Sequence, residues 1–301
     1  MKSGYYAGID IGTNGARLVI KDAFYNEERK LEAVEVNKVR VPLRLGADVY
    51  SIGELSERKI RQLSLCISSF RDLMNIYDVV SYSCLATSAM REAKNGKEVI
   101  ERIKKETGVT ISIIDGETEA KTISKIAKDF ALDDDKYVFI DVGGGSTEVT
   151  LVSKGKAVES NSFELGTLRI LAHKDKKETW GRFEDLLEDY HKKYGQLDIV
   201  GTGGNINRYW KMSKKKTNKK DLNYLSVEEL ENIYDELAKY TASQRVAKFD
   251  LKPDRADVII PAGNIFKKAS DILKTKTIYV PMIGLSDSIV DTLIDNYISV
   301  I

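Results

Sequence analysis

The chain has 301 residues, of which 42% are hydrophobic and 31% charged, so it has the composition and length of a globular protein with two lobes. A formal net charge of +1 gives no reason to expect a nucleic acid or membrane partner, and no apolar run approaches the roughly 20 residues of a membrane span. The only two cysteines, Cys66 and Cys84, form no CxxC pair, and no signal-type apolar stretch precedes the first strand, so we expect a cytoplasmic protein without a disulfide framework or thiolate zinc site.

The first half of the chain predicts three strands followed by alternating helices and strands. We expect strands at residues 6–11, 16–21, 32–41, 79–85 and 109–114. A long amphipathic helix is predicted from the spacing of Leu55, Leu63, Ile67, Phe70 and Met74. Further helices are expected at 97–107, where Gly108 ends the helix, and at 116–130, before an acidic turn at 133–135.

The second half begins again with strands, at 137–141, 149–152 and 156–164. A helix at 179–194 precedes a strand at 197–200, and the turn at 201–205 leads into a helix to about residue 212. Ser226 opens a capping box for a helix to residue 240. A helix at 255–269, a strand at 277–280 and a final helix from residue 285 complete the chain. The repeated order predicts a duplicated α/β fold with one mixed sheet in each lobe and a functional site in the cleft between them.

A short sequence motif occurs twice, once near each end of the first half of the chain, and is the strongest functional signal. Residues 10–19 and 141–149 each place an Asp at the end of an apolar strand, followed by a turn of small residues and a second strand. Such a pattern is typical of a β-hairpin whose glycines allow a ligand to approach the backbone. Because the N–H groups of a turn attract anions and an Asp can hold a cation, two facing hairpins would bind a phosphate chain and its metal. Asp141 is the best metal candidate, and Asp10 is its counterpart.

The second hairpin is the more specific of the two. Gly143, Gly144 and Gly145 are followed by Ser146 and Thr147, which together offer several N–H groups and two hydroxyl groups. An ordinary glycine-rich hairpin is the alternative. Glu148 stands where the first copy has Arg17, so the two copies have diverged in their chemistry.

Four further segments are weaker candidates, each with a structural alternative. The turn at 201–205 precedes a helix whose N-terminus could bind an anion, or it could be a plain turn. Arg91 could bind phosphate by a two-pronged contact or form a surface ion pair. Glu119 could act at a site, or only complement the helix dipole as we expect of Glu117. The basic run at 211–220 could steer a polyanion or be a solvated loop.

Together these segments resemble motifs of the exopolyphosphatase/guanosine pentaphosphate phosphatase (Ppx/GppA) family of the actin-like superfamily, over nearly the whole chain. Residues 10–18 are similar to its first phosphate motif, 86–93 to its threonine–arginine segment, 116–120 to its catalytic-glutamate motif and 141–148 to its second phosphate motif. Residues 201–204 and 255–257 match later motifs. Three positions depart from the usual pattern: Gly15 replaces Ser, Lys121 replaces Arg, and Ser288 replaces Gly.

The resemblance implies two actin-like, ribonuclease H-like domains with an interdomain cleft. The first would span 1–122, with a C-terminal helix at about 287–301 packing back on it, and the second would span 123–286; the chain would be the short, two-lobed type. The implied reaction is hydrolysis of the terminal phosphoanhydride bond of inorganic polyphosphate, which releases orthophosphate. Mg²⁺ is the implied cofactor, with another divalent cation or stimulation by K⁺ as options, and a homodimer is a further implication.

The resemblance also assigns roles. Glu119 would orient and deprotonate the attacking water, and Asp141, Asp10 and Glu148 would hold the metal. The implied phosphate-binding residues are Asn14, Gly15, Ala16, Arg17, Arg91, Gly144, Gly145, Ser146, Thr147, Gly203 and Gly204. The main alternative is hydrolysis of guanosine pentaphosphate in the stringent response; an actin-like ATPase or kinase and a non-catalytic sensor of polyphosphate or nucleotide are more remote.

Overall fold

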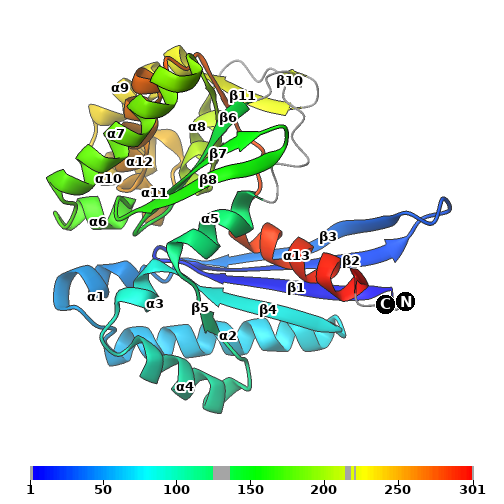
Figure 1. Cartoon of the computed structure of the whole chain (residues 1–301). Helices are drawn as coiled ribbons and strands as arrows, with labels where there is room; N and C mark the ends of the chain where they lie inside the picture. The colour runs from blue at the N-terminus through cyan, green and yellow to red at the C-terminus, as the bar shows by residue number, and fades with distance from the viewer. Residues whose placement is uncertain (1–2, 125–135, 214–217, 220–221, 300–301) are drawn as a thin grey trace. The chain divides into compact units, whose positions relative to one another are not determined.

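The computed structural model describes residues 3–124, 136–213, 218–219 and 222–299 (Figure 1). The chain divides into two compact units, one formed by Met1–Thr122 with Leu285–Ile301 and the other by Ile123–Gly284. Each unit has its own mixed sheet. The expected acidic turn at 133–135 and half of the expected basic run at 211–220 lie outside the described residues.

The sheet of the first unit has the order β3-β2-β1-β4-β5. Its antiparallel part is the meander β1 (Gly4–Ile11), β2 (Ala16–Tyr25) and β3 (Leu31–Val41), and β4 (Ser81–Ala86) and β5 (Ser112–Ile113) add to β1 in parallel. The expected strand at 109–114 is therefore only two residues long. The N–H groups of Val109 and Thr110 bond side-chain oxygens of Thr107 and Tyr82, so they are not available to a ladder.

Helices of this unit are α1 (Leu45–Ile52), α2 (Glu57–Ile76), α3 (Ser88–Glu92), α4 (Gly96–Thr107) and α5 (Gly116–Ser124). The predicted long helix is α2, but it begins at Glu57, so Leu55 lies before it, and α1 was not predicted. Gly53, with a φ of 83°, ends α1 in the left-handed region, where glycine carries no steric penalty. Ser56 then caps α2 by accepting the N–H of Lys59.

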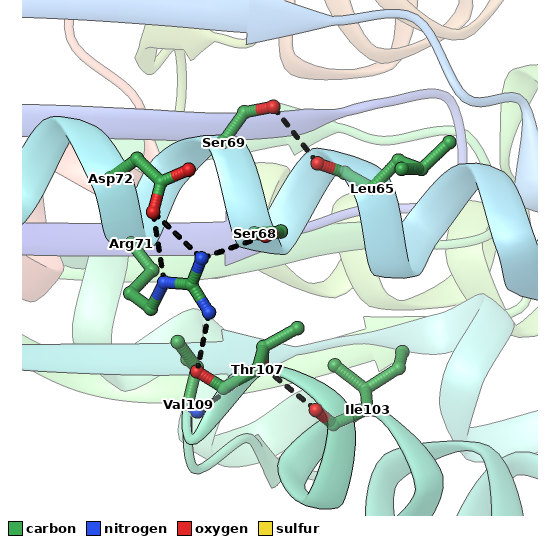
Figure 2. A network of polar contacts seen from close by, with 8 residues as sticks. All are labelled: Leu65, Ser68, Ser69, Arg71, Asp72, Ile103, Thr107 and Val109. Atoms are coloured by element: carbon green, nitrogen blue, oxygen red, sulfur yellow. Dashed lines mark hydrogen bonds and ion pairs between the residues drawn. The ribbon is translucent and has the colours of Figure 1, made fainter.

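Helices α2 and α4 are joined by a side chain as well as by packing (Figure 2). The guanidinium group of Arg71 on α2 donates to the carboxylate of Asp72 at 2.7 Å, to Ser68 at 3.0 Å and to the carbonyl oxygen of Thr107 at 3.4 Å. Thr107 is the last residue of α4. Because the final carbonyls of a helix have no partner within it, an Arg from a neighbouring helix satisfies this end well.

The C-terminal helix α13 (Leu285–Ser299) packs on β1, β2 and β4, although these strands lie far away in the sequence (Figure 1). Val290 and Ile294 join the buried cluster of the sheet. The helix approaches β1 most closely at Gly8, where an added Cβ would lie 2.5 Å from the carbonyl oxygen of Ser286. Two ion pairs add to this contact, Lys21 with Asp291 at 2.6 Å and Lys38 with Asp287 at 2.8 Å.

The second unit repeats the same sheet and extends it. Its order is β10-β11-β12-β9-β6-β7-β8, where β6 (Lys136–Val142), β7 (Thr147–Ser153) and β8 (Lys156–Phe163) form the antiparallel meander. Strands β9 (Asp198–Thr202) and β12 (Thr277–Tyr279) continue in parallel. Strands β10 (Asn218–Lys219) and β11 (Leu222–Ser226) are antiparallel additions at the other edge.

The helices of this unit are α6 (Thr167–Leu171), α7 (Lys177–Tyr194), α8 (Gly204–Met212), α9 (Val227–Ala238), α10 (Ala242–Phe249), α11 (Pro253–Ala256) and α12 (Ile259–Leu273). The predicted helix at 255–269 is wrong, because α11 and α12 are separate. Pro261 has no N–H and is tolerated only in a first turn, so a helix that contains it must begin close before it. Helix α12 packs against α7, α8 and α9 in the buried core.

The expected fold class, a duplicated α/β architecture with a mixed sheet in each copy, is confirmed. Within the described part of the chain, no helix is long and apolar enough to cross a membrane. Cys66 and Cys84 are free and buried, and burial raises the pKa of the Cys66 thiol to about 12, which disfavours the reactive thiolate.

We expect Gly8→Ala to loosen α13, because the new methyl group would meet main-chain atoms of that helix. The free energy of unfolding, measured by urea denaturation, should fall by about 1–3 kcal/mol, and the amides of α13 should exchange hydrogen faster. Gly4→Ala in the same strand is the control, since its methyl group meets only a side-chain atom of Val80 at 2.8 Å. Equal losses for the two variants would contradict the close docking of α13 at Gly8.

Candidate functional site

The turn between β6 and β7 presents its peptide groups in one direction. The carbonyl oxygen of Gly143 accepts the N–H of Thr167 at 3.0 Å, and that of Gly144 accepts the N–H groups of Leu168 at 2.8 Å and Arg169 at 3.2 Å. The Nε of Arg169 donates to the carbonyl oxygen of Gly145 at 2.8 Å. Three successive carbonyls therefore point toward the start of α6.

The direction of these three carbonyls also fixes the direction of the N–H groups in the same peptides, because the peptides are planar and trans. In such a peptide the C=O of one residue and the N–H of the next point in opposite directions. The N–H groups of Gly144, Gly145 and Ser146 must then point away from α6. They donate to no protein acceptor among the described residues, and successive free N–H groups of this kind form a concavity that attracts anions.

A row of polar side chains crosses four strands next to this turn. Asp141 and Glu148 are directly opposite on β6 and β7, and Thr202 of β9 and Ser162 of β8 extend the row on either side. Thr202 donates its hydroxyl to Asp141 at 2.6 Å, and Ser162 donates to Glu148 at 2.8 Å. These hydrogen bonds orient two neighbouring carboxylates. The side chain of Glu148 is only 3% exposed.

This pair of carboxylates fits Mg²⁺ as a partial site. No group of three or more His, Cys, Asp or Glu side chains in the described part of the chain is arranged to hold a metal ion. Mg²⁺ in phosphate-processing sites is usually held by one or two carboxylates together with substrate phosphates and water. A cage made only of protein groups is therefore not needed, and Asp141 with Glu148 has the required chemistry.

The turn between β1 and β2 is built in the same way. The carbonyl oxygen of Thr13 accepts the N–H of Gly46, and that of Asn14 accepts the N–H of Arg44, both at 3.0 Å. Helix α1 thus does for this turn what α6 does for the other. An added Cβ at Gly15 would lie 2.6 Å from the carbonyl oxygen of Val41, which accounts for glycine at the position where the family usually has serine.

The corresponding row in the first unit has the opposite charge. Asp10 is directly opposite Arg17, and Arg17 is directly opposite Arg40 on β3. Opposite residues on adjacent strands point to the same face, so the row runs from the carboxylate of Asp10 to the guanidinium groups of Arg17 and then Arg40. Ala16 is fully buried, so it can offer only its backbone to a ligand.

Arg91 and Glu119 are brought together within the first unit. The Nη1 of Arg91, on α3, donates to the carbonyl oxygen of Ile114 at 2.7 Å and lies 3.7 Å from Oε2 of Glu119, on α5. Glu119 is only 7% exposed. Asp115 caps α5 by accepting the N–H of Thr118 at 2.7 Å, and this bond holds the pKa of Asp115 below its ordinary value.

The neighbouring charged residues of α5 behave differently from Glu119. Glu117 and Lys121 form an exposed ion pair at 2.6 Å. Such a pair contributes little to stability. Burial therefore separates Glu119 from the surface charges in the same short helix.

The turn before α8 begins later than the sequence predicts. Gly201 and Thr202 belong to β9, Gly203 has a φ of 95°, and the helix starts at Gly204. An added Cβ at Gly204 would lie 2.1 Å from an Nη atom of Arg255. A guanidinium group thus lies beside the positive end of a helix dipole, an arrangement that a bound anion would stabilise.

The sequence did not predict α1 and α6, the two helices that support the turns. It also gave no sign of a role for Arg169 on α6 or for Arg40 on β3. Helix α6 has five residues, too few for an apolar period to be seen. Arg40 is recognisable only through its register with Arg17. The Leu-Gly-Thr-Leu-Arg sequence at 165–169 carries no general signal for a role.

Two units with one strand order, each with a turn of small residues after a strand that ends in Asp, define the actin-like class of folds. Within that class, a model of the Ppx/GppA phosphatase family matches residues 26–296, and the chain belongs to this family.

The similar proteins include phosphatases of several kinds. A bifunctional 3-dehydroquinate synthase/phosphatase of Fusobacterium nucleatum is 29% identical over 290 residues, which cover 88% of this chain and 43% of that protein. Exopolyphosphatase 1 of Mycobacterium tuberculosis is 29% identical over 143 residues, which cover 47% of this chain and 40% of that protein. The matches therefore span less than half the length of these relatives.

The fold itself is shared along the whole chain with a solved structure. The crystal structure of an exopolyphosphatase from Cytophaga hutchinsonii has a TM-score of 0.83 to this structure and 22% sequence identity, with 97% of this chain and 98% of that chain covered. At this identity the likeness shows a common fold.

We expect Gly166→Ala to displace the turn between β6 and β7, because its Cβ would lie 2.2 Å from the backbone nitrogen of Gly145. The free energy of unfolding should fall by about 1–3 kcal/mol in urea denaturation. Gly181→Ala on α7 is the control: its methyl group meets nothing within 4 Å, so stability should rise by roughly 0.5–1 kcal/mol. A neutral Gly166→Ala would contradict the described contact between α6 and the turn.

Proposed function

We propose that this chain is an exopolyphosphatase, which hydrolyses the terminal phosphoanhydride bond of inorganic polyphosphate and releases orthophosphate. The observation that carries the proposal is the turn between β6 and β7, where three N–H groups point away from α6 beside the carboxylates of Asp141 and Glu148. Phosphoryl transfer requires mainly positioning and neutralisation of charge. This half-site supplies N–H donors for phosphate oxygens next to ligands for their cation.

In the proposed mechanism, phosphate oxygens bind the N–H groups of residues 144–147 and of the turn at 14–17, with Gly203 and Gly204 as further donors. Asp141 and Glu148, with Asp10, would hold Mg²⁺, which would supply positive charge to neutralise the phosphates. Arg17 and Arg91 offset the remaining negative charge. Arg17 forms no ion pair with any described residue, so its guanidinium group is available to a phosphate.

Glu119 is the proposed general base. A water oxygen forms a bond to the terminal phosphorus, the anhydride P–O bond breaks, and the water proton passes to the carboxylate of Glu119. The shortened chain leaves with the bridging oxygen. Burial of Glu119 and the guanidinium group of Arg91 at 3.7 Å keep this carboxylate in a defined position, which general-base catalysis requires.

Glu119→Gln should lower kcat by at least about a hundredfold and leave KM nearly unchanged, because the amide cannot take a proton. Initial rates of orthophosphate release over a range of polyphosphate concentrations measure both constants. Glu117→Gln is the matched control, since this carboxylate is exposed on the same helix and pairs only with Lys121 in the contacts described. A loss smaller than a hundredfold would remove Glu119 as the base, and a Glu119→Gln protein that retained the cellular role would favour a sensor.

Orthophosphate release should be fast from long-chain polyphosphate with Mg²⁺ and should stop when EDTA removes the metal. The same assay with guanosine pentaphosphate and ATP separates the alternatives, because the half-sites described suit any terminal phosphoanhydride. Release from guanosine pentaphosphate alone would move the function to alarmone turnover and keep the residue roles. If only ATP or no substrate were hydrolysed, the proposal would be wrong. Stimulation by K⁺ and a homodimer stay predictions.

A further inference from the structure

We propose that Arg169 is a positioning residue that aims the N–H of Ser146 at the substrate phosphate; this role rests on the proposed function. Arg169 lies on α6 and is 5% exposed. Its Nε donates to the carbonyl oxygen of Gly145 at 2.8 Å. The carboxylate of Glu164, at 4.0 Å from Nη1, is 61% exposed, so this ion pair is weak.

The three peptides of the turn are not held in the same way. Main-chain N–H groups of α6 hold the carbonyls of Gly143 and Gly144. Only the carbonyl of Gly145 is held by a side chain, that of Arg169. Because the Gly145–Ser146 peptide is planar, fixing its C=O on the α6 side fixes the N–H of Ser146 on the opposite side.

The turn of the first unit has no carbonyl held in this way by a side chain among the described contacts. There the carbonyls of Thr13 and Asn14 are held by main-chain N–H groups of Gly46 and Arg44. Burying a guanidinium group carries a large desolvation cost. A buried Arg that donates to a backbone carbonyl in a turn of glycines is therefore best explained by the peptide that it orients.

Two substitutions separate the hydrogen bond from the charge. Nε is the fourth side-chain atom of Arg, and Arg169→Gln places an amide nitrogen, also a donor, at that atom. Arg169→Lys keeps the positive charge but places a methylene carbon there. If orientation of the peptide matters, Gln should stay within about threefold of the parent in kcat/KM, and Lys should lose about tenfold to a hundredfold.

Steady-state hydrolysis of polyphosphate with Mg²⁺ measures these changes, at a temperature where thermal melts show each variant folded. Glu164→Gln is the matched control and should change neither kcat nor KM. The reverse order, with Lys active and Gln impaired, would show that the guanidinium charge itself acts on the substrate and would overturn the proposal. Unchanged kinetics in both folded variants would overturn it too. If the Lys variant did not fold, Arg169→Met would take its place.

A binding measurement keeps this test separate from the proposed activity. Calorimetric titration of tripolyphosphate with Mg²⁺ into the Glu119→Gln protein, with and without Arg169→Gln or Arg169→Lys, should give the same order in Kd. If the Kd values followed this order but the parent chain hydrolysed no polyphosphate, the proposed function would fail and the role of Arg169 would stand. Equal Kd values in an active enzyme would overturn only the role of Arg169.

Discussion

The orientation of a few peptide groups is the constraint on which the rest of the candidate site depends. A helix begins with N–H groups that have no partner within it, and in both units such groups, from α6 and from the start of α1, bind carbonyls of an adjacent turn. The carbonyls of the turn are satisfied on one side, and their peptides present N–H groups on the other. The short helices α1 and α6 therefore fix the direction in which the turns present their N–H groups.

The same backbone carries opposite charges in the two units. In the first unit, Arg17 lies opposite the Asp of the leading strand and Arg40 lies one strand further on. In the second unit, these positions hold Glu148 and Ser162. A row with two guanidinium groups suits phosphate oxygens, and a row with two carboxylates suits the metal that accompanies them. The two turns share their geometry, whereas the rows of side chains beside them differ in charge.

Burial marks which polar groups belong to the candidate site. Ser146, Thr147 and Glu148 are at most 4% exposed, and burying such groups costs free energy unless they are bonded. The contacts of Thr147 with the carbonyl oxygen of Leu165 and of Glu148 with Ser162 offset part of this cost. Glu119 is also buried, whereas Glu117 and Lys121 on the same helix are exposed to water. Buried polar groups at the end of a sheet are more informative here than the charge of the whole chain.

The sequence by itself determined the local and repeated features of this protein. The sequence predicted both hairpins, the Asp at each strand end and the family. It also showed that corresponding positions of the two copies hold the oppositely charged Arg17 and Glu148. These features are readable because turn glycines, alternation and motif spacing are properties of neighbouring residues. The predicted long helix begins at Glu57 rather than at Leu55, because Ser56 is its N-cap. The continuous helix predicted across 255–269 was wrong, since Pro261 is tolerated only near the start of a helix. The family resemblance already implied that the C-terminal helix packs on the first unit. Only the tertiary structure decided that α13 meets β1 at Gly8, that Arg40 joins the row of Arg17, and that Arg169 reaches the carbonyl of Gly145. These contacts depend on strand register and on the packing of distant segments, and neither leaves a periodic trace in the sequence.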